Sequence, residues 1–216
     1  MIAPVAPIPT SLSAWQAQRH HIRSRLWQCL GELPAPIMPA PCTLTKTLRD
    51  GCLTEHFSYD NGAGATVFGY FVTPPTVTTP LPAILYLHVH GGKYTLGKEE
   101  LFQERTPHRV PALALTQAGY AVMAIDAYGF GERHSFGDES GNGVEQALYK
   151  HFLWQGSSLW GMMLRDDLMA LDYLISRPEV DPQRIGITGM SLGGSRATWL
   201  AALDERPAAV VPVAQL

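Results

Sequence analysis

The fold of this chain is decided by residues 184–194, Arg184-Ile185-Gly186-Ile187-Thr188-Gly189-Met190-Ser191-Leu192-Gly193-Gly194. Residues 184–188 form a short, apolar and partly β-branched run, which predicts a buried parallel strand. The turn-rich stretch 178–182 ends the preceding segment, and residues 193–203 read as a helix. The order of strand, tight turn and helix predicts an α/β fold in which Ser191 occupies the turn.

The two glycines around Ser191 have a steric reason. A strained turn brings the residues two positions either side of the serine together, so side chains at Gly189 and Gly193 would clash. A Gly-x-Ser-x-Gly turn between a strand and a helix is typical of the nucleophile elbow of α/β-hydrolases. We therefore predict Ser191 as a catalytic nucleophile and the Leu192 N–H as an oxyanion donor. The alternative is an accidental turn in a chain that contains 20 glycines.

A second oxyanion donor is expected after an earlier strand. The apolar run 82–87 leads into His88-Val89-His90-Gly91-Gly92, which matches the start of the His-Gly-Gly-Gly-type loop of esterases. We assign the second donor to the Gly92 N–H, with Lys93 as the substitute, and expect His90 to shape the loop rather than to act as the base. The alternative is that both histidines are ordinary strand-end residues beside a turn.

Composition limits the class of protein. The 216 residues suffice for one domain with a sizeable core, and the charged fraction of 16% suits a buried parallel sheet. The net charge of −3 and the lack of a basic block give no support for nucleic-acid binding. No apolar run is long enough to cross a membrane, and the proline-rich N-terminus makes a poor signal peptide.

The cysteines bear on the compartment and on cofactors. Cys29, Cys42 and Cys52 are an odd number, which favours reduced thiols in a cytoplasmic protein over a disulfide framework. No Cys and His spacing resembles a zinc site. We therefore expect no metal site built on cysteine and histidine.

Two parts are expected along the chain. Residues 1–41 should hold a helix over 12–30 and a proline-rich linker, with Trp15, Ile22, Leu26 and Leu30 docking that helix on the main domain. Residues 42–216 should form a partial hydrolase domain. Its expected elements are antiparallel strands within 43–73 around an Asn61-Gly62 turn, buried strands at 83–89, 120–126 and 208–214, a short helix before Gly119 and a helical run over 143–176.

Several polar residues have two readings. The glycine-rich loop 128–142 follows a predicted parallel strand, where α/β sheets place ligands, so Glu132, Arg133 and His134 are candidate pocket-edge residues together with His90. The alternative for the loop is a solvated segment with a structural Glu–Arg pair. Three acids of the helical run, Asp166, Asp167 and Asp172, are expected to be solvent-facing or capping residues.

Taken together, the chain resembles the dienelactone hydrolase and acetylxylan esterase branch of the α/β-hydrolases over roughly residues 40–216. The resemblance rests on segments 87–92, 124–126, 129–133, 166–174 and 184–194. It implies hydrolysis of a small-molecule carboxylic ester through a serine nucleophile, without a metal or organic cofactor. The oligomeric state stays open.

The chain departs from that branch after the serine. Only 25 of the 216 residues follow Ser191, and none is a histidine. Asp204 and Glu205 come too early to match the branch's acid, and the histidines at 88, 90, 108, 134 and 151 all precede Ser191. We expect a sheet that is incomplete at its C-terminal edge, a triad acid and histidine that are not in this chain, and near inactivity of the chain alone. The alternatives are a non-catalytic remnant or interaction module and a serine peptidase of the prolyl-oligopeptidase type.

Overall fold

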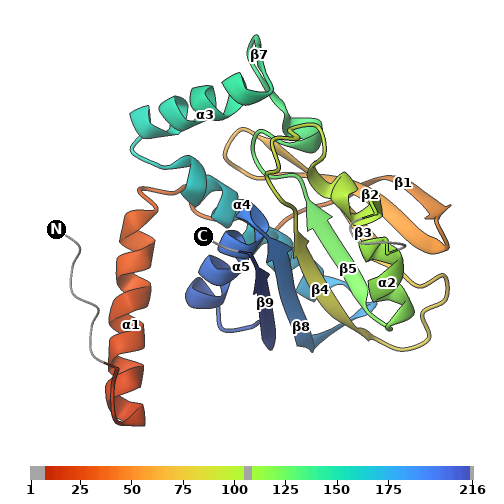
Figure 1. The fold of residues 1–216 in the computed structure, drawn as a ribbon, viewed down its shortest axis with the longest axis horizontal. Coiled ribbons are helices and arrows are strands. Elements are labelled where there is room, and N and C mark those ends of the chain that lie inside the picture. The colour runs from red at the N-terminus through yellow and green to blue at the C-terminus, as the bar shows by residue number, and fades with distance from the viewer. Residues whose placement is uncertain (1–7, 105–108, 215–216) are drawn as a thin grey trace.

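The chain folds around a mixed seven-stranded sheet in a computed structural model that describes residues 8–104 and 109–214 (Figure 1). The strands are β1 (Cys42–Arg49), β2 (Cys52–Asp60), β3 (Thr66–Thr73), β4 (Leu81–Leu87), β5 (Ala121–Ile125), β8 (Val180–Met190) and β9 (Ala209–Val213). Their order across the sheet is β1-β2-β3-β5-β4-β8-β9. The last four strands of this order, β5, β4, β8 and β9, run parallel to one another. The first three are antiparallel to their neighbours, and β3 also pairs antiparallel with β5.

Helices cover both faces of this sheet. They are α1 (Leu12–Cys29), α2 (Pro111–Gln117), α3 (Asn142–Trp154), α4 (Leu159–Ser176) and α5 (Leu192–Leu203), with short 3₁₀ turns at η1 (Gly97–Phe102) and η2 (Gly131–Arg133). The β5 strand shows the two layers, because Met123 packs in the core under α4 and α5 while Val122 packs in the core with α2 and η1. The expected α/β architecture with an N-terminal helix is confirmed.

Most predicted elements fall close to their observed bounds, but β8 begins at Val180, inside the stretch 178–182 that was expected to be a turn, and one helical run is divided. The helical run expected over 143–176 breaks into α3 and α4, and Ser158 caps α4 by accepting a hydrogen bond from the Gly161 N–H at 3.0 Å. The glycine-rich loop before α3 carries a two-stranded hairpin, β6 (Ser135–Phe136) and β7 (Glu139–Ser140). This hairpin and α3 lie together at one end of the sheet (Figure 1).

The α1 helix docks on the main domain only through the C-terminal part of the apolar face predicted for it. Leu30 is buried and Leu26 packs against the main core, but Trp15 and Ile22 remain 46% and 42% exposed. The helix is instead tied to α5 by Arg23, whose guanidinium donates to the Ala202 carbonyl at 2.9 Å and to Glu205 at 2.7 Å. Figure 1 shows the rest of α1 projecting away from the sheet.

The expectation that the acids of α4 are solvent-facing is wrong. Asp166 and Asp167 are fully buried, and Asp167 accepts a hydrogen bond at 2.8 Å from the Nε of Arg196, which is equally buried. Asp172 is half-buried and pairs with Arg206 at 2.6 Å. Periodicity alone could not show this, because the arginines that neutralise these carboxylates come from other elements.

The described residues include no helix long and apolar enough to cross a membrane. All three cysteines are free thiols, with Cys52 buried and the other two exposed.

Candidate functional site

Ser191 lies at the sharp turn between β8 and α5. Its backbone has φ 54° and ψ −117°, a left-handed conformation that few non-glycine residues adopt. The turn is held by the Ser191 N–H, which donates to the Val213 carbonyl at 2.9 Å, and by the Ser191 carbonyl, which accepts from the Ser195 N–H at 2.9 Å. Ser191 is exposed and directly follows the carboxyl end of β8.

The glycines beside Ser191 are required by the close packing of this turn. A Cβ atom on Gly189 would lie 2.6 Å from the Gly193 backbone, and one on Gly193 would lie 2.0 Å from the Leu87 carbonyl oxygen. Both contacts are to backbone atoms, which cannot move aside as a side chain can. Gly189 thus lies against Gly193 as the sequence predicts, whereas the close neighbour of Gly193 is the end of β4.

The Leu192 N–H stands free of the helical ladder. Leu192 is the first residue of α5, and the first N–H groups of a helix have no intrahelical acceptor. The N-terminal end of a helix also carries partial positive charge. This N–H can therefore stabilise negative charge that develops next to Ser191.

The loop after β4 leaves the sheet beside the turn at Ser191. Leu87 of β4 pairs with Gly189 of β8 in parallel register, so the two segments leave the same edge of the sheet. In this loop the Gly92 N–H donates to Nδ1 of His90 at 3.0 Å, and the Lys93 N–H donates to the His90 carbonyl at 3.1 Å. The predicted second donor, Gly92, and its substitute, Lys93, are thus both bonded within their own loop, and His90 accepts from each.

His88 is a structural residue in the described fold. The ring is fully buried; its Nε2 accepts from the Ala127 N–H at 3.1 Å, so its Nδ1 carries the proton that is donated to the Val89 carbonyl at 2.8 Å. Burial, reinforced by the nearby positive charge of Arg196, lowers the pKa of His88 to about 3.

A pH dependence of stability follows from His88. In the unfolded chain this imidazole takes up a proton near pH 6.5, while in the folded chain it does so only near pH 3, so its contribution to stability is complete above pH 6.5 and is lost as the pH falls toward 3. We expect the difference in the free energy of unfolding between wild type and His88→Gln to shrink by up to about 1.4 kcal/mol for each pH unit below 6.5. Urea unfolding at pH 7, 6 and 5 measures it, and a constant difference would contradict the argument.

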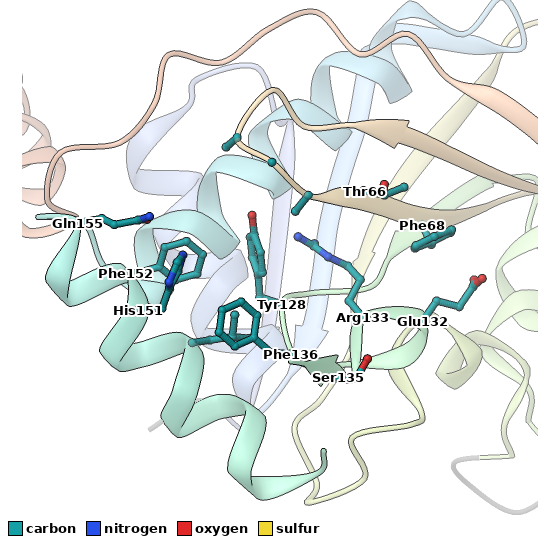
Figure 2. A pocket seen from close by; sticks show the side chains of 14 residues that line it. Thr66, Phe68, Tyr128, Glu132, Arg133, Ser135, Phe136, His151, Phe152 and Gln155 are labelled. Carbon is teal, nitrogen blue, oxygen red and sulfur yellow. The ribbon is translucent and has the colours of Figure 1, made fainter. Parts of the chain in front are cut away.

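Two of the predicted pocket-edge residues do line a pocket, of about 330 Å³, between the β3 strand, the β6 hairpin and α3 (Figure 2). Glu132 accepts from His56 at 2.7 Å and also pairs with Lys98. Burial opposes its ionisation, but Lys98 and His56 hold the pKa of Glu132 below the usual range. Arg133 is buried, donates to the Asp126 carbonyl at 2.9 Å and lies 2.9 Å from Asp166.

The alternative of a solvated Glu–Arg pair therefore does not describe this loop, because Glu132 and Arg133 turn to different partners. The residues lining the pocket do not include Ser191. His134 lies outside that lining too and is tied to the Gly131 carbonyl through Nδ1 at 2.6 Å.

Asp204, Glu205 and His151, which were also weighed above as triad residues, contact other groups. Asp204 pairs with Arg206 at 2.6 Å, and Glu205 pairs with Arg23 at 2.7 Å. His151 lines the pocket, where its ring is tilted against Phe136 and meets Phe152 edge to face. His108 lies outside the described residues. Among the residues that the structure describes, no group of three or more His, Cys, Asp or Glu side chains could hold a metal ion.

Sequence reasoning missed the residues of α3 and of the β4 loop that surround His90. Nε2 of His90 lies 2.9 Å from Oε2 of Glu145, and the Tyr94 hydroxyl donates to the same oxygen at 3.1 Å. Burial and this hydrogen bond raise the pKa of Tyr94. No sequence signal links these residues, because their contact depends on how α3 folds over the loop.

A mixed sheet covered by helices on both faces, with a strained serine turn after a parallel strand, defines the α/β-hydrolase fold. Within that fold, this chain belongs to the acetyl xylan esterase (AXE1) family, whose model matches residues 52–215.

Three known proteins illustrate the similarity. The Bacillus subtilis protein named "Putative hydrolase YtaP" is 40% identical over 186 residues, covering 85% of this chain and 60% of YtaP. The "Uncharacterized peptidase YuxL" of the same organism is 28% identical over 160 residues, covering 74% of this chain and 21% of YuxL. A crystal structure of a "putative acetyl xylan esterase" from Bacteroides fragilis superposes with a TM-score of 0.77 at 20% identity, covering 92% of this chain and 53% of that one. The chain thus spans little more than half the length of YtaP and of the B. fragilis protein.

Proposed function

We propose that this chain carries the nucleophile and the oxyanion donors of a serine hydrolase that acts on small-molecule carboxylic esters. The observation that carries the proposal is the left-handed backbone of Ser191 between β8 and α5, since strain of this kind clusters at functional sites. Membership of the acetyl xylan esterase family supports an ester as the substrate class.

In the proposed reaction, Ser191 Oγ attacks the ester carbonyl and the alcohol leaves, which gives an acyl-enzyme that water then hydrolyses. The N–H groups of Leu192 and Gly92 would stabilise the negative charge on the carbonyl oxygen in the tetrahedral intermediate. The proton on Ser191 must pass to a base. We propose that this base and its acid partner are not among the residues of this chain, and the engagement of the histidines at 56, 88, 90, 134 and 151 with other groups supports this.

The 216-residue chain alone is therefore expected to be nearly inactive. Without the base, the rate should exceed that of the reaction in water by only roughly 10³–10⁴-fold, which is what substrate binding and the oxyanion donors supply. Release of p-nitrophenol from p-nitrophenyl acetate, compared between wild type and Ser191→Ala, measures it. Clear Ser191-dependent turnover by the chain alone would show that the base lies within it.

The nucleophile itself is tested on the longer reading frame. Where an aspartate and a histidine are encoded in frame after Leu216, the extended protein is expected to hydrolyse aryl acetates, and Ser191→Ala should lower kcat at least about a thousandfold. Ser195→Ala, in the first turn of α5, is the matched control and should keep the activity. Equal turnover in the two variants, or an immediate stop codon, favours a non-catalytic remnant or interaction module.

A peptidase is the second candidate, favoured by the similarity to YuxL. The preferred substrate distinguishes an esterase from a peptidase. A carboxylic esterase should prefer an aryl acetate to a peptidyl p-nitroanilide by a wide margin, and the reverse preference would support the peptidase.

A further inference from the structure

The Gly92 N–H, a proposed oxyanion donor, already has an acceptor in the structure. Nδ1 of His90 receives it at 3.0 Å. A nitrogen that accepts a hydrogen bond carries no proton, so the neutral ring of His90 must hold its proton on Nε2. That Nε2–H points to Oε2 of Glu145 at 2.9 Å. The three groups form one directed chain from the backbone through the ring to a carboxylate.

Glu145, the last group in this series of hydrogen bonds, comes from a separate element. It lies in the first turn of α3, more than fifty positions from His90 in sequence, and its side chain is 29% exposed. The Tyr94 hydroxyl donates to the same carboxylate oxygen at 3.1 Å, and the rings of His90 and Tyr94 meet edge to face with centroids 5.2 Å apart. The carboxylate accepts hydrogen bonds but cannot donate one, so it favours the tautomer with the proton on Nε2.

The loop is built for close approach of the backbone. Gly91 and Gly92 have φ values of 54° and 66°, and, apart from its two chain neighbours, no residue has an atom within 4 Å of a Cβ built on Gly92. Gly92 also lines a pocket of about 510 Å³. The N–H held by His90 therefore belongs to a residue with open space beside it.

We propose that His90 and Glu145 are positioning residues for the oxyanion loop. Glu145 holds His90 in the Nε2–H tautomer, and the unprotonated Nδ1 holds the Gly92 N–H in its resting orientation. To accept a hydrogen bond from the Gly92 N–H, a substrate oxygen must therefore displace His90 Nδ1. The inference rests on the proposed function only for the role of Gly92, while the hydrogen-bonded chain can be measured without any turnover.

The test is nitrogen-15 NMR of the full chain. A scalar coupling across the N–H···N hydrogen bond should connect Gly92 N with His90 Nδ1, and the ring nitrogen shifts should report a proton on Nε2. In Glu145→Ala the tautomer ratio should move about tenfold or more toward Nδ1–H, as expected for loss of a hydrogen bond to a charged group. The coupling should weaken with it, and the Gly92 amide resonance should shift.

Gln146→Ala is the matched control, because Gln146 is the exposed next residue of α3. It should leave the tautomer, the coupling and the Gly92 resonance unchanged. A proton on Nδ1 of His90 in the wild type, or a Glu145→Ala spectrum with the wild-type tautomer and Gly92 shift, would overturn the proposal. The couplings could be intact while the extended protein shows no Ser191-dependent hydrolysis. That result would support the positioning role of His90 and Glu145 and refute the proposed function.

Discussion

Replacing Asp167 with alanine is expected to lower the free energy of unfolding by about 3–5 kcal/mol. Asp167 and Arg196 are both 0% exposed, and the Arg196 Nε donates to Asp167 at 2.8 Å. Removing the carboxylate leaves a guanidinium buried without its counter-charge, and that desolvation cost causes the loss. Because Arg196 lies on α5, the helix that starts at Ser191, the variant should also loosen the serine turn.

Urea unfolding followed by circular dichroism measures this loss. Asp172→Ala on the same helix is the control, since its partner Arg206 is 42% exposed and such a pair contributes about 0–1 kcal/mol. The double variant Asp167→Leu with Arg196→Leu removes both charges and should be less destabilised than Asp167→Ala. Equal stability of Asp167→Ala and Asp172→Ala would show that the buried pair does not stabilise the fold.

Gly193→Ala is expected to destabilise the protein by about 3 kcal/mol, the upper end for inserting one methyl group into a packed site. The new Cβ would lie 2.0 Å from the Leu87 carbonyl oxygen and 2.9 Å from the His88 carbonyl oxygen. Both oxygens belong to the backbone where β4 ends. Relief of the clash must therefore move either β4 or the start of α5.

Gly186→Ala is the matched control for this change. Gly186 lies on β8 seven positions earlier, and the nearest atom to its added Cβ is 3.7 Å away, an ordinary contact. Thermal unfolding of both variants and of wild type measures the contrast. Similar melting temperatures for Gly193→Ala and Gly186→Ala would mean that the serine turn tolerates a side chain at position 193.

The sequence was sufficient to predict the α/β fold wherever its signal was local. The Ile185–Thr188 run and the glycine pair around Ser191 predicted a strand, a turn and a helix, and the structure has β8, the strained serine and α5 there. The bounds of α1 were predicted closely and its docking was expected, but the small extent of that docking was not, because an apolar periodicity does not say where a partner surface ends. Only its last turn meets the core.

The arrangement of the site was less predictable, for reasons of charge and distance. Asp166 and Asp167 look like solvent-facing acids until Arg133 and Arg196 are placed beside them. In the same way, the hydrogen bond from Gly92 to His90 is local and the role of His90 in shaping the loop could be suspected, but its other partner Glu145 comes from α3.

The register between β4 and β8 has a consequence for folding kinetics. Leu87 pairs with Gly189, so the loop that holds Gly92 and the turn that holds Ser191 meet only when two segments far apart in the chain have joined. Bringing together β4 and β8 closes the long segment of chain between them, and this costs entropy before any contact is gained. Non-local pairings of this kind slow folding. The antiparallel strands β1 to β3 are joined by short turns and can form locally. The serine turn should therefore be among the last parts of the molecule to become ordered.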